Sequence, residues 1–139
     1  MAWVLRRAGR GAQAAAFLAD LRERLPAIRA DYPRAAIRIE MLSAGMALDA
    51  DRPARALAHI EASDSMLGER GARMPLDNHE QVELALLAGD VRAAAGQVDA
   101  ARRDWLTGRE LAKRLLGAEH PLRIEIESRL RIEPRPGGE

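Results

Sequence analysis

The sequence predicts an all-α protein built from antiparallel helix hairpins, with about six to seven helices. Apolar residues recur every three or four positions through most of the chain, which is the spacing of one face of an α-helix. Alanine, a strong helix former that is poor in strands, is abundant, and aromatic residues make up only 3% of the 139 residues. Short turn-forming stretches separate the periodic segments, as expected between helices that pack side by side.

One segment, residues 93–121, contains this pattern in its most complete form. It predicts the end of one helix, a turn at Gly96 and Gln97, and a long second helix. Glycine suits the turn because it tolerates positive φ angles. Asp99 falls in the first turn of the second helix, where a negative charge interacts favourably with the helix dipole. The apolar or small residues of that helix share one face: Val98, Ala101, Trp105, Gly108, Ala112 and Leu115.

The same layout recurs upstream, which indicates an internal repeat. Residues 51–56 parallel residues 96–101, 45 positions earlier, and residues 9–14 parallel residues 51–56 a further 42 positions back. A small residue at each equivalent site lets two helices approach closely, and a large apolar residue one turn later fills the space beyond. The small set is Ala14, Ala56 and Ala101, and the large set is Leu18, Ile60 and Trp105. The alternative is an irregular helical domain in which abundant alanine matches by chance.

Residues 96–121, GQVDAARRDWLTGRELAKRLLGAEHP, resemble the tetratricopeptide repeat (TPR) family, in particular the longer repeats of kinesin light chains. Within them, residues 116–121 resemble the L-G-x-x-H-P connection between repeats, whereas residues 51–71 and 8–25 match less closely and lack His-Pro. The resemblance implies a TPR-like α-solenoid whose concave surface binds a protein or peptide, without catalysis. In many bacterial regulators such repeats follow a kinase or transcription-regulator domain, so it also implies a C-terminal part of a larger protein.

The first half of the chain predicts four helical segments. Residues 1–9 form a short helix containing Trp3, and residues 12–30 form a second helix that Pro26 ends or kinks. Residues 34–48, which Pro33 precedes at a favourable helix start, have two adjacent apolar strips. These strips indicate packing between neighbours, with a methionine-lined binding groove as the alternative. Residues 52–68 form the partner helix.

The second half predicts a loop at residues 69–77 and a helix at residues 78–95 that Asp77 or Asn78 caps. Gly89 and Asp90 are expected to bend or split that helix. Residues 121–132 predict a closing helix that begins at Pro121, although alternating apolar residues leave a strand open. The predicted repeat domain therefore spans residues 1–132, and the polar, proline- and glycine-containing residues 133–139 form a disordered tail.

Composition excludes several classes of function. The net charge is +1, with 22 basic and 21 acidic residues interspersed, whereas nucleic-acid binders show a basic excess or stripe. The absence of cysteine excludes disulfides and thiolate metal sites and agrees with a cytoplasmic location. No stretch approaches the roughly 20 apolar residues that span a bilayer. The N-terminal arginines, which follow a very short apolar run, do not fit a secretory signal.

The sequence contains no recognisable catalytic motif, so no enzyme, metal or cofactor is predicted. His79-Glu80 lacks the second histidine of the zinc-protease pattern, and no nucleophile elbow or phosphate-binding glycine loop is present. His59 is interpreted as a helix-surface residue. His120 is interpreted as ordering the His-Pro turn.

The leading hypothesis is a cytoplasmic protein-interaction scaffold without nucleic-acid or membrane partners. Its candidate contacts, chosen by position on the first helix of each hairpin, are Arg34, Arg38, Ser43, Glu80, Glu83 and Arg92. The second hypothesis is a structural protein that forms a homodimer through apolar ends, which include Trp3, Val4, Leu5, Ile124 and Ile132. The third is a small helical enzyme or ligand-binding protein, which would need an enclosed pocket with convergent polar groups.

Overall fold

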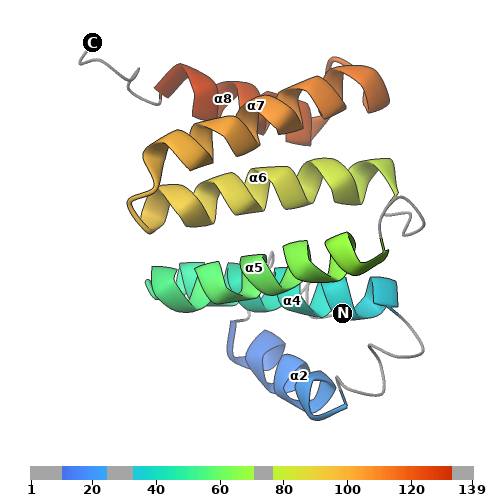
Figure 1. Ribbon diagram of the computed structural model, residues 1–139, viewed down its shortest axis with the longest axis vertical. Coiled ribbons are helices and arrows are strands. Elements are labelled where there is room, and N and C mark those ends of the chain that lie inside the picture. The colour runs from blue at the N-terminus through green and yellow to red at the C-terminus, as the bar shows by residue number, and fades with distance from the viewer. Residues whose placement is uncertain (1–10, 25–32, 71–76, 133–139) are drawn as a thin grey trace. The chain divides into compact units, whose positions relative to one another are not determined.

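The computed structural model describes residues 11–24, 33–70 and 77–132, and all secondary structure in them is helical (Figure 1). The described residues form six helices and no strand, which confirms the all-α class. The chain divides into two compact units, Met1–Pro75 and Leu76–Glu139, and each is described by itself. Together, the two units include the predicted repeat domain, residues 1–132. The predicted helix at residues 1–9 and the predicted tail at residues 133–139 fall outside the described residues.

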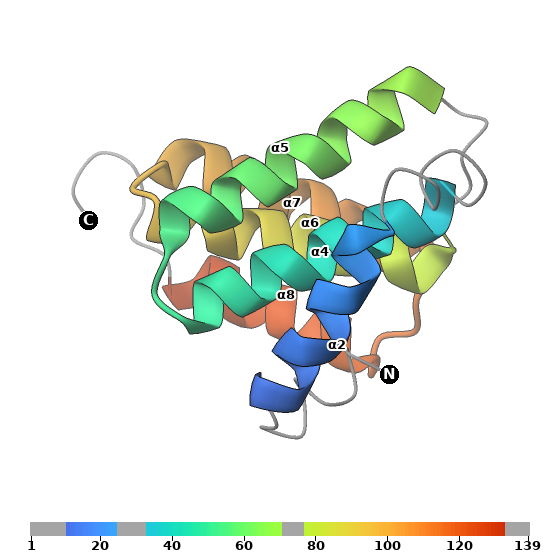
Figure 2. The same ribbon diagram turned by 90° about the horizontal axis from the view of Figure 1, so that it is seen from below.

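The first unit contains α2 (Gly11–Glu23), α4 (Pro33–Asp49) and α5 (Pro53–Arg70). A short turn joins α4 to α5, and the two helices pack along each other as a hairpin (Figure 2). The helix α2 packs against α4. The sequence predicted that the second helix spans residues 12–30 and ends or kinks at Pro26. The observed α2 ends at Glu23, and Pro26 lies outside the described residues. The most completely buried apolar residues of the unit are Ala36, Ile37, Ala44, Ala56 and Ile60.

The second unit contains α6 (Asn78–Ala94), α7 (Val98–Leu115) and α8 (Pro121–Ile132). Its core is a cluster of seven buried residues drawn from all three helices: Val82, Leu86, Ala101, Trp105, Ala112, Leu122 and Ile126. On α7, four of the six residues predicted on the buried face are buried. The other two lie at the ends of α7, where the face extends past the core: Val98, the first residue of the helix, is 42% exposed, and Leu115, the last, is half-buried.

Helix starts follow the sequence signals closely. Pro33, Pro53 and Pro121 are each the first residue of a helix, where the missing N–H of proline costs nothing. Asp77, rather than Asn78, is the cap of α6: its side chain accepts from the N–H of Glu80, and the carboxylate of Glu80 accepts from the N–H of Asp77. This reciprocal capping box satisfies two N–H groups that have no partner within the helix.

The prediction that Gly89 and Asp90 interrupt their helix is wrong, because α6 runs without a break through both residues. Gly89 instead provides room for Trp105: a Cβ atom on residue 89 would overlap Nε1 and Cδ1 of the indole. The strand alternative for residues 121–132 is also wrong. Helical spacing turns Leu122 and Ile126 into the core and leaves Ile124 54% exposed. A helix therefore buries the apolar side chains that pack against α7.

The two hairpin turns have the same backbone hydrogen bonds. The N–H of Arg52 donates to the carbonyl of Ala47 at 2.9 Å, and the N–H of Asp51 donates to Leu48 at 3.0 Å. In the second unit, Gln97 donates to Arg92 at 2.8 Å and Gly96 donates to Ala93 at 3.1 Å. Both turns are Schellman motifs, in which the residue after the helix adopts a left-handed conformation. That residue is Asp51 (φ 57°) in one and Gly96 (φ 84°) in the other, and the two are 45 positions apart.

Because both residues adopt this left-handed conformation, substitutions at Asp51 and Gly96 are expected to change the free energy of unfolding in opposite directions. We expect Asp51→Gly to raise the free energy of unfolding by about 0.5 kcal/mol, because glycine relieves left-handed strain but adds entropy to the unfolded chain. We expect Gly96→Ala to lower it by about 1 kcal/mol for the reverse reason. Urea unfolding followed by circular dichroism measures both. Gly117→Ala is the control with little expected loss, because a Cβ there meets nothing within 4 Å and its φ lies outside the left-handed range. A loss of stability in Asp51→Gly would contradict the assignment.

Candidate functional site

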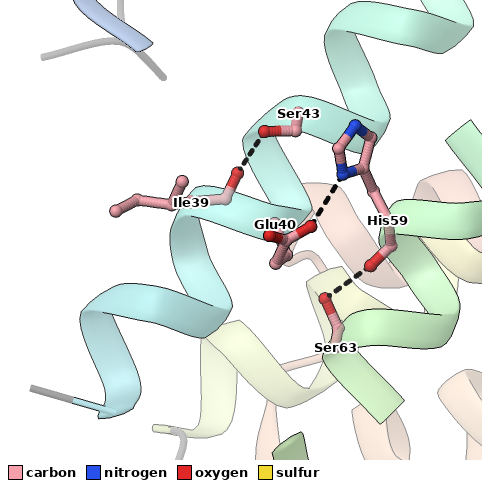
Figure 3. A network of polar contacts seen from close by, with 5 residues as sticks. All are labelled: Ile39, Glu40, Ser43, His59 and Ser63. Carbon is pink, nitrogen blue, oxygen red and sulfur yellow. Dashed lines mark hydrogen bonds and ion pairs between the residues drawn. The ribbon is translucent and has the colours of Figure 1, made fainter. Parts of the chain in front are cut away.

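The best-defined polar site in the first unit joins Glu40 on α4 to His59 on α5 (Figure 3). The Oε2 atom of Glu40 lies 2.7 Å from Nδ1 of His59. Glu40 is only 4% exposed, and the His59 side chain is 17% exposed. If Glu40 is a carboxylate, which only accepts hydrogen bonds, Nδ1 of His59 is the donor in this contact.

Two buried serines flank the pair, but neither hydroxyl is directed at the imidazole. Ser43 donates to the carbonyl of Ile39 at 2.8 Å, and Ser63 donates to the carbonyl of His59 at 3.2 Å. Figure 3 shows the Ser43 hydroxyl turned toward Ile39 and away from His59. Each hydroxyl therefore satisfies itself on the preceding turn of its own helix, a common arrangement for serine within helices.

This arrangement explains what the cluster can do chemically. A carboxylate that orients an imidazole occurs in catalytic triads, where the imidazole in turn contacts a nucleophile. Here the neighbouring hydroxyls donate to backbone carbonyls, so the serines are not activated by His59. The contact between Glu40 and His59 instead ties the two helices of the hairpin together through buried, charge-assisted hydrogen bonding.

The sequence interpretation of His59 as a helix-surface residue is wrong, and Glu40 was not singled out. Glu40 lies between the apolar residues Ile39 and Met41, both buried, so a charge within an apolar strip was the available signal. A second signal was position, since Glu40 and His59 are roughly equidistant from the turn at Asp51 and therefore meet when the hairpin closes.

The predicted contact residues of the first unit lie on α4. Arg34 is exposed and Arg38 is half-buried, one helical turn apart, and each has a polar or electrostatic contact of its own. Ser43 is 5% exposed and belongs to the network of Figure 3. The structure therefore leaves Arg34 as the most accessible of the three.

The predicted contact residues of the second unit lie on α6 and take part in local contacts. Glu80 is 1% exposed and forms the capping box, while Glu83 is 6% exposed and its Oε2 lies 3.2 Å from Nδ1 of His79. Arg92 forms an ion pair with Asp104 of α7. Each of these three side chains therefore has a structural partner within its own unit.

Two histidines, His79 and His120, meet where α6 approaches the start of α8. The rings of His79 and His120 meet edge to face, with centroids 5.6 Å apart and planes inclined by 61°. The Nδ1 atom of His120 accepts from the N–H of Leu122 at 3.2 Å, and its carbonyl accepts from the N–H of Arg123 at 3.0 Å. His120 thus caps α8, which agrees with its predicted role in ordering the His-Pro turn.

A further polar centre, Asp90, connects the three helices of the second unit. One carboxylate oxygen accepts from Nε1 of Trp105 at 3.2 Å and from Nε of Arg129 at 2.9 Å, and the other accepts from Nη2 of Arg129 at 3.2 Å. The hydrogen bond to Asp90 raises the pKa of Arg129 above its ordinary value, while partial burial opposes the shift. The sequence analysis treated Asp90 only as a helix breaker and missed this contact.

The part of the chain that the structure describes offers one open depression and no group of metal-binding side chains as a reaction site. Among residues 11–24, 33–70 and 77–132, no three or more His, Asp or Glu side chains are grouped so that they could hold a metal ion. A depression beside α7 is open to solvent, and its described lining residues all come from that helix: Leu106, Thr107, Glu110, Leu111, Lys113 and Arg114. None of the described helices is both long and apolar enough to cross a membrane.

Comparisons with protein-family models, with curated proteins and with solved structures return no match for this chain. The geometry and the sequence pattern are therefore the basis for assigning a function.

Proposed function

We propose that this chain is a non-catalytic protein-interaction module built from repeated helix hairpins of a TPR-like kind. The observation that carries the proposal is the pair of identical Schellman turns at Asp51 and Gly96. Both occur at the offset of 45 residues that relates the two hairpins in sequence. Repeated helix hairpins form extended surfaces whose common use is protein or peptide binding.

Burial at equivalent positions supports the same proposal. Ala56 and Ala101 are fully buried, and so is Ile60, while its equivalent Trp105 is 3% exposed. A small residue followed one turn later by a large apolar residue thus occupies the interior of both hairpins. Leu18, the equivalent residue on α2, is 6% exposed, whereas the side chain of Ala14 lies outside the described residues.

In each unit, the proposed partner contacts lie on the first helix of the hairpin, which is α4 in the first unit and α6 in the second. On α4, Arg34 and Arg38 follow the helix at a spacing of one turn and supply positive charges for a protein partner. The acidic candidates Glu80 and Glu83 are held in contacts with Asp77 and His79, so we place the first test on the two arginines.

We expect reversing both α4 charges, Arg34→Glu/Arg38→Glu, to weaken partner binding about tenfold, as loss of interfacial charge complementarity commonly does. The partner is captured from native lysate on the tagged chain, then purified, and its affinity for each variant is measured by isothermal titration calorimetry. The matched control, Arg52→Glu/Arg55→Glu, makes the same change in net charge on exposed residues at the start of α5.

Circular dichroism must show both variants folded, because Arg34 and Arg38 have contacts within the chain. Equal weakening by both variants would contradict a binding surface on α4. Recovery of the chain alone, together with a mass that rises with concentration, would favour self-assembly. Of the apolar residues that the sequence assigned to this interface, Ile124 has a described side chain, which is 54% exposed and which the interface would cover.

A further inference from the structure

A second charged surface lies along the contact between α7 and α8. These helices pack against each other: a Cβ on Gly108 would lie 3.0 Å from Cδ1 of Ile126, and Nε of Arg109 lies 3.9 Å from Oε1 of Glu127. The second distance is too long for a hydrogen bond, so the two charges attract without a directional contact. Arg109 and Glu127 therefore mark the facing sides of the two helices.

Helical spacing adds four more cations to these facing sides. On α7, Arg102 lies two turns before Arg109, and Lys113 lies one turn after it. On α8, Arg123 and Arg131 lie one turn before and one turn after Glu127. We call this surface the basic seam: Arg102, Arg109, Lys113, Arg123 and Arg131, with Glu127 as its one acidic residue.

Few of these cations are neutralised by the rest of the described chain. Lys113 approaches Glu110 at 4.0 Å, but the two side chains are 49% and 72% exposed, so this pair is weak. Arg123 donates to the carbonyl of Leu116 at 3.4 Å, and neither Arg102 nor Arg131 has an acidic partner among the described residues. By contrast, the two arginines of α6 and α8 outside the seam, Arg92 and Arg129, each have an aspartate partner.

Two arginines of the seam, Arg102 and Arg109, are half-buried, and one nitrogen of each, Nη1 of Arg102 and Nε of Arg109, is covered by the chain without an acceptor. A partner can therefore contact only the other N–H groups of these two guanidinium groups. A carboxylate is a suitable acceptor for them, because charge-assisted hydrogen bonds are about twice as strong as neutral ones and arginine matches a carboxylate geometrically. Arg102 and Arg109 lie two helical turns apart, a spacing that two separate carboxylates of one segment could meet.

We propose that the basic seam binds an acidic segment of a partner protein, with carboxylates placed against Arg102 and Arg109. This inference rests on the proposed interaction function but places a second contact on α7 and α8, separate from the α4 arginines. A peptide fits better than a nucleic acid, because the whole chain has a net charge of only +1, whereas nucleic-acid binders show a strong basic excess.

The test uses the full chain and a fluorescein-labelled peptide of ten glutamates, with a ten-glutamine peptide as the uncharged control. Fluorescence anisotropy at low salt measures the dissociation constants. We expect the glutamine peptide to bind negligibly. We expect Arg102→Gln/Arg109→Gln to weaken glutamate-peptide binding about fivefold, because the binding free energies of two partly exposed charge pairs are lost together. The matched control, Arg52→Gln/Arg55→Gln, removes the same charge outside the seam and is expected to change the affinity less than about twofold.

Glu127→Gln is the more decisive variant, because it removes the one acid of the seam and is expected to tighten binding about twofold. A merely structural role of these residues would not produce such a gain. Equal weakening by the two arginine pairs, or no effect of Glu127→Gln, would overturn the proposal. Tighter binding of a labelled ten-nucleotide single strand with the same residue dependence would assign the seam to nucleic acid and overturn it as well. Loss of this binding would leave the α4 experiment unaffected, so the two proposals fail independently.

Discussion

Gly89→Ala is expected to lower the free energy of unfolding by about 2–3 kcal/mol, as overpacking of a close contact does. In an ordinary helix interior the same change stabilises by about 1 kcal/mol, because alanine is the better helix former. The sign reverses here because a Cβ on residue 89 would overlap the indole of Trp105 and lie 2.9 Å from its Cε2 atom. Trp105 is 3% exposed and its Nε1 donates to Asp90, so the ring has little freedom to move away.

The first hairpin provides the control for this experiment. At the offset of 45 residues, Ala44 and Ile60 occupy the positions of Gly89 and Trp105, and both are fully buried. Gly89→Ala/Trp105→Ile therefore recreates a pair that the chain already accommodates. We expect its loss of stability to be smaller than the sum of the two single losses by about 1–2 kcal/mol. Guanidinium unfolding of the four proteins gives this coupling, and simple additivity would contradict the packing between α6 and α7.

His59→Leu is expected to lower the free energy of unfolding by about 2 kcal/mol, because it removes a hydrogen-bond partner from the buried carboxylate of Glu40. Glu40 is 4% exposed and has a further polar contact besides His59. The expected loss is therefore smaller than for a buried carboxylate left with no partner. The measurement is urea unfolding of the full chain at constant pH.

A double replacement separates the cost of a stranded charge from the value of the pair. Glu40→Leu/His59→Leu is expected to be more stable than His59→Leu by about 1–2 kcal/mol, because an apolar pair removes the buried charge altogether. Ser63→Ala serves as the comparison within the same network, since its hydroxyl only supplements a helix carbonyl, and its expected loss is below about 1 kcal/mol. A double variant that is less stable than the single variant would contradict the stranded charge and indicate that Glu40 stabilises the hairpin through its other contact.

Local sequence signals located most of the helices in the described residues. The prolines at 33, 53 and 121, the capping aspartate at 77 and the glycine turn at 96 each act within a few residues. Their effects on the backbone are steric or involve one hydrogen bond, so neighbouring sequence is sufficient to predict them. The apolar face of α7 was predicted for the same reason, and at Val98 it extends past the core.

The candidate site was predicted less well, because its partners are distant in sequence. Glu40 and His59 are 19 residues apart, and Asp90 and Arg129 are 39 residues apart. Helix periodicity alone places His59 beside a buried isoleucine, on the border of the apolar face, and does not say what lies opposite. Of the six predicted contact residues, Ser43, Glu80 and Glu83 have polar partners within four residues, but all three are buried. Their burial depends on the packing of neighbouring helices, which a single-helix view could not reveal.

The sequence by itself determined that this chain forms helices and where most of them begin. It also placed a turn at the equivalent position of two hairpins. These properties depend on backbone preferences and on a repeating pattern of side-chain size, both of which act over a few residues. Only the tertiary structure decided that Gly89 makes room for Trp105 instead of breaking α6. It also decided that Asp90 joins three helices, because packing brings side chains from separate helices within hydrogen-bonding distance. In a dry interior, steric fit and the need to pair polar groups outweigh the weak local preferences that the sequence displays.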